Sequence, residues 1–254
     1  MLGSRGCTVN NLPATVFVVD DDADVRRALG RLMQSAGYDV QVFGSSADFL
    51  TANDPERAGC LILDLAMPDM DGLEVQAALV ASGSPRPIIF LSGNGSIAAS
   101  VMAMRAGAVT FLTKPVESRH LLAAVDEGLR IDAVERAKKA MLSEVLRRIE
   151  SLTPRERQVL THVVAGRLNK QIAADLGTVV KTIKVHRARV MHKMGVRSAA
   201  QLARLTAMAG IEAPAKGHVR TAQAELELDI APVHGEHPIA MDAPFSGVGR
   251  EPAM

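Results

Sequence analysis

The chain has 254 residues, 48% of them hydrophobic, and a net charge of +1, which suits a globular protein of one large domain or two modest ones. No apolar run approaches the roughly 20 residues that span a bilayer, and residues 1–11 lack the apolar stretch of a signal peptide. Two cysteines are too few for a disulfide framework or a structural zinc site. We therefore expect a cytoplasmic protein with free thiols and no membrane partner.

The small net charge hides a strong segregation along the chain. Residues 12–130 hold nine Lys or Arg against 15 Asp or Glu, a net charge of −6, whereas residues 151–211 hold 11 against two, a net charge of +9. This predicts an acidic domain over 12–130, a linker over 131–150 and a basic domain over 151–211, flanked by a flexible segment 1–11 and an acidic Pro/Gly-containing tail 212–254 that we expect to be disordered. The basic domain points to nucleic acid.

Short apolar runs alternate with helical patterns throughout residues 12–130. Strands are predicted at 16–19, 40–43, 60–64, 88–91 and 109–112, each followed by apolar residues at helical spacing. Five strand–helix units predict an α/β fold, a five-stranded parallel sheet with helices on both faces. With right-handed crossovers, the flavodoxin-like strand order 2-1-3-4-5 is favoured, and this order places the first and third strands side by side.

Polar residues gather where these strands end. Asp20 and Asp21 follow the first strand, Asp64 ends the third, and Ser92 and Lys114 follow the fourth and fifth. Because three adjacent carboxylates repel one another, they need a divalent cation to ionise together, and Mg²⁺ or a similar ion such as Mn²⁺ suits carboxylates with open water positions. Lys114 and Ser92 would add a charge and a hydroxyl donor for a phosphoryl group. Each residue alone has an ordinary alternative, for example Lys114 as a solvated surface lysine.

Four motifs in this half resemble the receiver domain of two-component response regulators. They are Asp20-Asp21, Asp64-Leu65-Ala66-Met67-Pro68, Ser92-Gly93 and Phe111-Leu112-Thr113-Lys114-Pro115. The resemblance implies that a partner sensor histidine kinase phosphorylates Asp64. It also implies that the metal is held by Asp21, Asp64 and the backbone carbonyl of Ala66, with Asp20 acting through water.

The same resemblance assigns roles to residues around the phosphoacceptor. It makes Ser92 the switch hydroxyl, Lys114 the ion-pairing lysine and Phe111 the rotating aromatic ring. It further implies a cis peptide bond between Lys114 and Pro115. A surface over residues 97–119 would form a homodimer contact after phosphorylation.

Helical patterns dominate residues 131–211. A linker helix is predicted over 131–149, and Thr153-Pro154 with Glu156 predicts a capped helix that ends at Gly166. Further helices are predicted over 170–176, 179–194 and 198–209. A short helix, a glycine turn and a long basic helix together indicate an all-α helix-turn-helix domain.

The long basic helix has two distinct faces. Helical spacing turns Ile183, Val190 and Met194 inward and leaves the opposite face basic and small. Side chains suited to the DNA major groove lie there: Lys181, Lys184, Val185, Ala188 and His192. Phosphate contacts are predicted for Lys170, Arg187, Arg189, Lys193 and Arg197. The alternative is a merely solvated basic face.

Three motifs here resemble the LuxR-type helix-turn-helix, namely Leu152-Thr153-Pro154-Arg155-Glu156-Arg157, Asn169-Lys170-Gln171-Ile172-Ala173 and Lys181-Thr182-Ile183-Lys184-Val185-His186-Arg187. With the receiver motifs, they resemble transcriptional regulators of the FixJ/NarL group. The resemblance implies a regulator, not a turnover enzyme, that binds double-stranded promoter DNA as a phosphorylation-dependent dimer. It places Lys184, Val185 and Ala188 against bases and makes helix 198–209 a dimer contact, and RNA polymerase is a further candidate partner.

Two rival interpretations use part of the same sequence. Asp20-x-Asp22 after a strand also fits the nucleophile motif of haloacid-dehalogenase-like phosphatases, but this leaves Asp64 and the basic domain unexplained. A receiver that serves as a constitutive dimerisation module would leave the five polar residues at the strand ends without a role. The alternating segment 225–230 of the tail, expected to be disordered, could instead be a docking segment or could shield the basic domain.

Overall fold

The computed structural model describes residues 14–83, 86–93 and 97–211, so the predicted N-terminal segment 1–11 and tail 212–254 lie outside the described residues. Its first part, here called the sheet region, contains five parallel strands in the order β2-β1-β3-β4-β5. The strands are β1 (Thr15–Val19), β2 (Asp39–Phe43), β3 (Gly59–Asp64), β4 (Ile88–Ser92) and β5 (Thr110–Thr113). The predicted flavodoxin-like order is confirmed.

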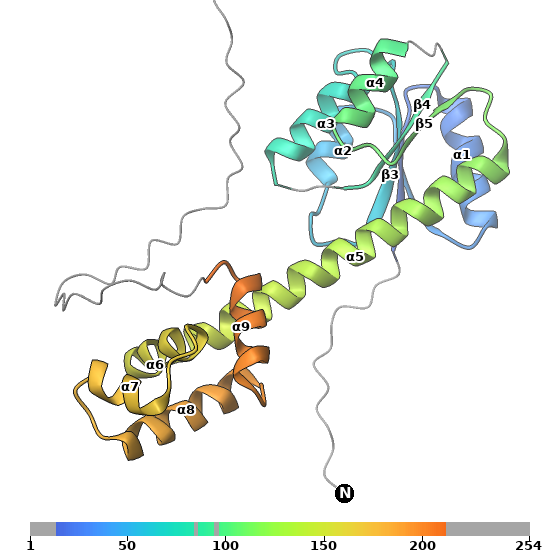
Figure 1. Cartoon of the computed structure of the whole chain (residues 1–254). Coiled ribbons are helices and arrows are strands. Elements are labelled where there is room, and N and C mark those ends of the chain that lie inside the picture. Colours follow the sequence, from blue (N-terminus) through green and yellow to red (C-terminus); the bar gives the residue numbers. More distant parts are fainter. Residues whose placement is uncertain (1–13, 84–85, 94–96, 212–254) are drawn as a thin grey trace, which may run out of the picture. The chain divides into compact units, whose positions relative to one another are not determined.

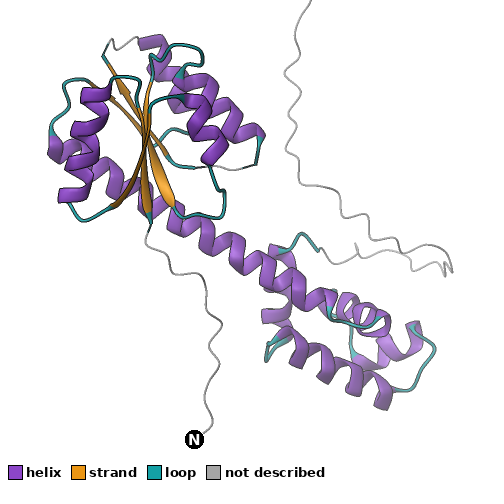
Figure 2. Ribbon diagram, turned by 180° about the vertical axis from the view of Figure 1, so that it is seen from behind, coloured by secondary structure: helices purple, strands orange, loops and turns teal. Residues whose placement is uncertain are grey.

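Helices cover both faces of this sheet (Figures 1 and 2). The first face carries α1 (Ala23–Ser35) and the first half of α5 (Ser118–Glu150), and the second carries α2 (Ser46–Ala52), α3 (Gly72–Ala81) and α4 (Ile97–Arg105). Alternate residues of each strand serve the two faces, so that Val16 and Val18 pack under α1 and α5 while Phe17 and Val19 pack under the other helices. Strands buried on both faces explain the continuous apolar runs of the sequence.

One uninterrupted helix, α5, leaves the sheet region. Its first turns bury Leu121 and Val125 against the sheet, and its last turns bury Val145 and Ile149 in a separate hydrophobic core. The helix predicted over 131–149 is thus observed as the second half of α5. In the part of the chain that the structure describes, no helix is both long enough and apolar enough to cross a membrane.

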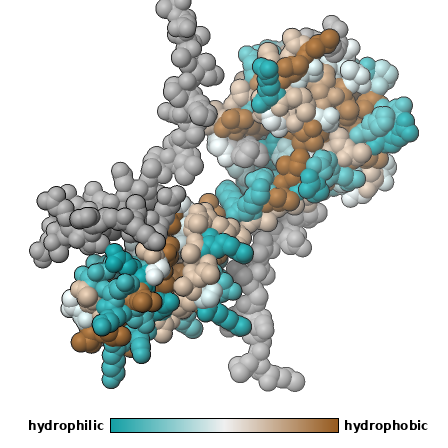
Figure 3. Space-filling view, in the orientation of Figure 1, coloured by the Kyte–Doolittle hydropathy of each residue, from teal (hydrophilic) through white to brown (hydrophobic). Residues whose placement is uncertain are grey.

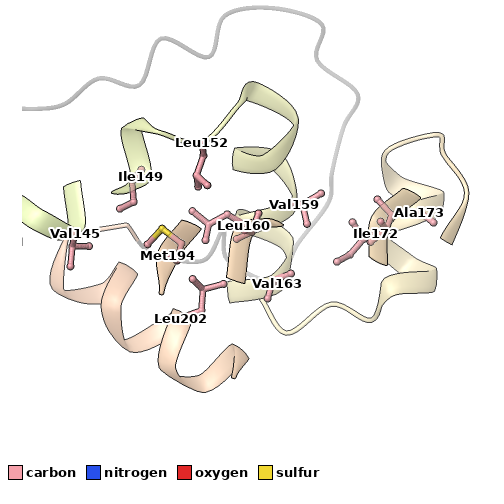
Figure 4. Close-up of a cluster of buried hydrophobic side chains, with 12 residues drawn as sticks. Val145, Ile149, Leu152, Val159, Leu160, Val163, Ile172, Ala173, Met194 and Leu202 are labelled. Atoms are coloured by element: carbon pink, nitrogen blue, oxygen red, sulfur yellow. The ribbon is translucent and has the colours of Figure 1, made fainter. Parts of the chain in front are cut away.

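Four shorter helices form the second part, here called the helical region: α6 (Pro154–Val164), α7 (Asn169–Asp175), α8 (Val180–Met194) and α9 (Ala199–Met208). Figure 4 shows side chains from α5, α6, α8 and α9 converging on one core, among them Ile149, Leu160, Met194 and Leu202. The predicted capping box is present, because Thr153 accepts a hydrogen bond from the Glu156 amide while Glu156 accepts one from the Thr153 amide. Helix α8 ends at Met194 and is capped by Gly195, whose φ of 65° is left-handed.

Candidate functional site

Three carboxylates meet at the edge of the sheet where the strands end. Asp20 follows β1, and Asp64 is the last residue of β3; the two strands pair with Val19 beside Leu63. Carboxylate oxygens of Asp20, Asp21 and Asp64 lie within 4.8 Å of one another. Asp20 and Asp64 are buried, whereas Asp21 is exposed. The convergence predicted from the strand order is therefore present in the fold.

Lys114 reaches this acidic cluster (Asp20, Asp21 and Asp64) from the end of β5. Its Nζ lies 2.8 Å from Asp20 Oδ2 and 3.1 Å from Asp64 Oδ2. Its backbone N–H donates to the carbonyl of Ser92 at 2.8 Å, which ties the loop to β4. The peptide bond between Lys114 and Pro115 is cis, as predicted. The lysine is thus held over two buried carboxylates.

The positive charge of Lys114 does not balance the negative charges of the three carboxylates in the acidic cluster. Burial raises the pKa of Asp20 above its ordinary value, although the hydrogen bond and charge of Lys114 act in the opposite direction. Burial also acts to lower the pKa of Lys114, but its hydrogen bonds to Asp20 and Asp64 outweigh this and raise it. Asp64 Oδ1 is buried without a hydrogen-bond partner in the described part of the chain. One ammonium group is therefore shared by the two buried carboxylates of a cluster of three, and one oxygen of Asp64 remains available to a ligand.

A glycine makes room beside the last residue of β3. Gly72 begins α3, and an added Cβ there would lie 2.6 Å from the carbonyl oxygen of Asp64 and 2.9 Å from the ring of Phe90. Such distances require the backbone to shift. Helix α3 can therefore start directly against Asp64 only because residue 72 has no side chain.

The helical region presents a second candidate site on α8. Its inward face buries Ile183, Val190 and Met194. Its outward face exposes Lys181, Lys184, Val185, Ala188 and Arg189. Helix α7 and the turn at Gly177 precede α8 and complete a helix-turn-helix. The division of α8 into inward and outward faces agrees with its helical period.

Comparison with known proteins identifies both parts. Residues 16–126 match the family described as "Response regulator receiver domain", and residues 150–206 match "Bacterial regulatory proteins, luxR family". The chain is 40% identical to Nodulation protein W of Bradyrhizobium diazoefficiens over 83% of its own length and 93% of that protein. It is 43% identical to response regulator protein TodT of Pseudomonas putida over 76% of its length and 85% of that protein. The chain belongs to the response regulators with a LuxR-type DNA-binding domain.

A solved structure supports the same assignment. Response regulator StyR matches with a TM-score of 0.72 and 44% identity, over 77% of this chain and 99% of that chain. Transcriptional regulatory protein FixJ of Bradyrhizobium diazoefficiens is 39% identical over 77% of this chain and 96% of that protein. The chain is thus a two-component response regulator and a FixJ- and TodT-like transcription regulator rather than a turnover enzyme, which excludes the phosphatase interpretation. The sheet region is its receiver domain, and the helical region is its DNA-binding domain.

The remaining predicted residues of the receiver lie around the acidic cluster. Ser92 is buried at the end of β4, next to Leu91, which pairs with Asp64. The ring of Phe111 on β5 is half-buried and stacks on Phe90 with 6.2 Å between ring centroids. Ala66 is exposed in the loop after β3. Their roles in switching and metal binding stay predictions.

The structure adds a receiver residue that sequence reasoning missed. Arg26 of α1 donates from Nη1 to the carbonyl oxygens of Asp20 and Asp21, at 2.6 and 3.2 Å. Its guanidinium group thereby holds the backbone that carries two of the three carboxylates. Asp22, in contrast, caps α1 by accepting from the amides of Asp24 and Val25.

Two basic residues predicted to contact DNA are engaged inside the DNA-binding domain. Lys193 Nζ lies 2.7 Å from Oε2 of the buried Glu156 and 2.9 Å from the carbonyl oxygen of Ser151. Arg187 donates to Asn169 Oδ1 at 3.2 Å, which joins α8 to the start of α7. The predicted phosphate contacts of both residues remain untested, but Lys193 clearly joins α8 to α6.

Proposed function

We propose that a sensor histidine kinase phosphorylates Asp64 and that this modification promotes dimerisation and promoter binding. The observation that carries the proposal is the charge imbalance at the acidic cluster, where buried Asp20 and Asp64 share the single ammonium group of Lys114. A buried carboxylate with an unpartnered oxygen is suited to accept a phosphoryl group or a metal. A purely structural ion pair would have its polar atoms satisfied.

The donor set fits a hard divalent cation. Asp20, Asp21 and Asp64 would hold magnesium or manganese together with the backbone carbonyl of Ala66, since such ions prefer oxygen ligands and retain water. When bound, the cation would neutralise charge on the phosphoryl oxygens. Arg26 would help by fixing the loop that carries Asp20 and Asp21.

The chain's own residues account for the transfer step. An oxygen of Asp64 attacks the phosphorus of a phosphohistidine, a P–O bond forms, and the P–N bond breaks with its electron pair passing to the imidazole. Lys114 lies within 3.1 Å of the Asp64 carboxylate and offsets the negative charge that arrives there. Positioning and charge neutralisation are the main requirements of phosphoryl transfer.

Two residues, Ser92 at the end of β4 and Phe111 on β5, would change their contacts when Asp64 is phosphorylated. Ser92 donates to the new phosphoryl oxygen, and Phe111 rotates inward beside Phe90, which changes the surface of α4 and β5. Figure 3 shows hydrophobic side chains gathered over α4, where Ile97 is 82% and Met102 55% exposed. This surface within residues 97–119, with or without α9, would join two copies.

A dimer would place two α8 helices on DNA half-sites about one helical turn, roughly 34 Å, apart. Lys181, Lys184, Val185 and Ala188 would face bases, and Lys170, Arg187 and Arg189 would approach phosphates. The ammonium group of Lys193, also predicted to contact phosphate, is instead engaged by Glu156 and Ser151. Raising the active fraction from ~1% to ~99% needs about 5.5 kcal/mol of differential binding. Phosphorylation must therefore act together with dimerisation and DNA binding, with RNA polymerase as a further candidate partner at the promoter.

The test compares wild type with Asp64→Asn after treatment with acetyl phosphate and Mg²⁺. Wild type should show a phosphate-dependent gel shift, become dimeric by light scattering and bind promoter DNA more tightly. Asp64→Asn should do none of these, whereas Asp71→Asn, at the exposed cap of α3, should behave like wild type. A dimeric, DNA-bound Asp64→Asn chain indistinguishable from phosphorylated wild type would refute the proposal and favour a constitutive dimerisation module.

A further inference from the structure

A polar cluster with two buried charged residues, Asp132 and Arg86, lies at the edge of the sheet opposite Asp64. Strand β3 begins at Gly59 and ends at Asp64, so residues near Gly59 lie at the far end of the strand that carries the phosphoacceptor. Asp132 and Arg136 of α5 meet Arg86, which precedes β4, around the segment 53–59. We call Asp132, Arg136 and Arg86 the base clamp. None of these residues belongs to the acidic cluster or to the DNA-contacting face.

Asp132 and Arg136 attach α5 to the start of β3. Asp132 Oδ2 accepts hydrogen bonds from the backbone N–H of Gly59 at 2.9 Å and from Arg136 Nε at 2.8 Å. The other guanidinium nitrogens of Arg136 donate to the carbonyl oxygens of Pro55, Glu56 and Arg57, at 2.9, 3.0 and 2.7 Å. A single side chain thus satisfies three consecutive carbonyl groups of the α2–β3 loop.

Arg86 completes the cluster from the sheet side. It is only 6% exposed and donates to Asn53 Oδ1 and to the carbonyl oxygens of Asp54 and Arg57. Its guanidinium carbon lies 4.2 Å from the ring centroid of Phe17 on β1. The Arg57 carbonyl is therefore shared by Arg86 and Arg136, which joins the two arginines through one backbone group.

Such a cluster is costly to bury and contributes more to geometry than to stability. The apolar contacts of Leu121 and Val125 already hold α5 on the sheet, and Gly128 lies directly over Cys60. The base clamp adds directional hydrogen bonds one and two turns further along, so that α5 is fixed to the receiver through residue 136. The same helix then supplies Val145 and Ile149 to the core of the DNA-binding domain.

We propose that the base clamp is the joint that couples the receiver to the DNA-binding domain through α5. Strand β3 carries Asp64 at one end and the clamped Gly59 amide at the other, and all six of its residues are buried. A change around Asp64 can bias the part of α5 beyond Gly128 only if that part is also held to the strand, and Asp132 and Arg136 hold it. The coupling rests on the proposed phosphorylation of Asp64. Asp132 and Arg136 are positioning residues, because neither touches the phosphoacceptor or DNA.

The experiment measures coupling in the full chain rather than stability. Promoter DNA selected with wild type is titrated with and without beryllofluoride and Mg²⁺, and the ratio of the two dissociation constants is compared among variants. Arg136→Ala and Asp132→Asn should each reduce this ratio at least about fivefold, roughly 1 kcal/mol of coupling. Arg136→Lys should restore little, because an ammonium group cannot reach three carbonyls in a fork.

Lys139→Ala is the matched control, since Lys139 pairs with Glu56 on the same side of α5 but is 72% exposed. Its ratio should equal that of wild type. A purely structural clamp would lower the melting temperature and leave the ratio unchanged, so an unchanged ratio in both Arg136→Ala and Asp132→Asn overturns the inference. A wild-type chain that ignores beryllofluoride would refute the phosphorylation switch and the coupling together.

Discussion

The two domains bury charge in opposite ways. In the receiver, Asp20 and Asp64 are buried around one lysine, and an oxygen of Asp64 has no partner among the described residues. In the DNA-binding domain, buried Glu156 accepts hydrogen bonds from Lys193 and, as part of a complete capping box, from the Thr153 amide. Incomplete neutralisation therefore marks a site prepared for a ligand, whereas complete neutralisation marks a scaffold.

The largest expected effect comes from removing the buried charge of the receiver. In Asp20→Asn, Mg²⁺ affinity should fall by about tenfold to a hundredfold, because the metal site loses a carboxylate that acts on the ion through water. The free energy of unfolding without metal should rise, since burial disfavours the charged form of Asp20 and raises its pKa. Calorimetric Mg²⁺ titration and denaturant unfolding measure the two quantities.

Asp22→Asn provides the control for this variant. Asp22 is exposed and caps α1, and asparagine caps a helix equally well. Both its metal affinity and its stability should match wild type. An Asp20→Asn chain that is less stable than wild type without metal would contradict the proposed charge imbalance.

Removing the lysine of the satisfied pair should act on stability alone. Lys193→Met leaves the carboxylate of Glu156, 3% exposed, without its cation and should cost the DNA-binding domain about 2 kcal/mol. The slope of log affinity for DNA against log salt should stay unchanged, because Lys193 is engaged with Glu156 and Ser151. A slope flatter by about 0.9 would instead show a phosphate contact.

The same pair predicts a pH dependence with a definite sign. The hydrogen bond from Lys193, with that from the Thr153 amide, lowers the pKa of Glu156 below its ordinary 4.5. Its stabilisation is therefore present above pH 4.5 and is lost as the pH falls through the lower folded value. Glu156→Gln should be less stable than wild type at neutral pH and converge with it below that value. Melting temperatures of both chains, measured from neutral pH down through acidic pH, test this. A stability difference between wild type and Glu156→Gln that persists at the acidic end would contradict the prediction.

The smallest expected effect concerns a single exposed cation on α8. Arg189→Ala should flatten the salt slope of DNA binding by about 0.9, the loss of one phosphate contact. Arg119→Ala, an exposed arginine of the receiver paired with Glu117, is the control and should leave the slope unchanged. Equal slopes for wild type and Arg189→Ala would assign Arg189 to the solvated surface.

The periodicity of apolar residues in the sequence predicts those features of the fold and the site that follow from regular strands and helices. The rule that parallel strands end at one edge brought Asp20, Asp64 and Lys114 together, and the helical period sorted the faces of α8. The fifth strand is shifted by one residue, from the predicted 109–112 to Thr110–Thr113, because strand ends depend on pairing with β4.

Long-range polar partners could not be predicted in this way. Arg26 contacts the loop carbonyls of Asp20 and Asp21, which lie outside regular structure. Lys193 of α8 contacts Glu156, which lies on another helix, α6. Arg136 was assigned to the linker, since nothing in its helical pattern indicates the α2–β3 loop 79 residues earlier in the chain. Such pairings require the tertiary fold.

The absence of a side chain at Gly72 limits how this receiver can evolve. A methyl group there would press on the carbonyl of Asp64 and the ring of Phe90 at once, and Phe90 also stacks on Phe111. An alanine substitution should therefore displace Asp64 and the aromatic pair in a single step. A larger residue at this position could be accommodated only if the start of α3 moved away from the end of β3.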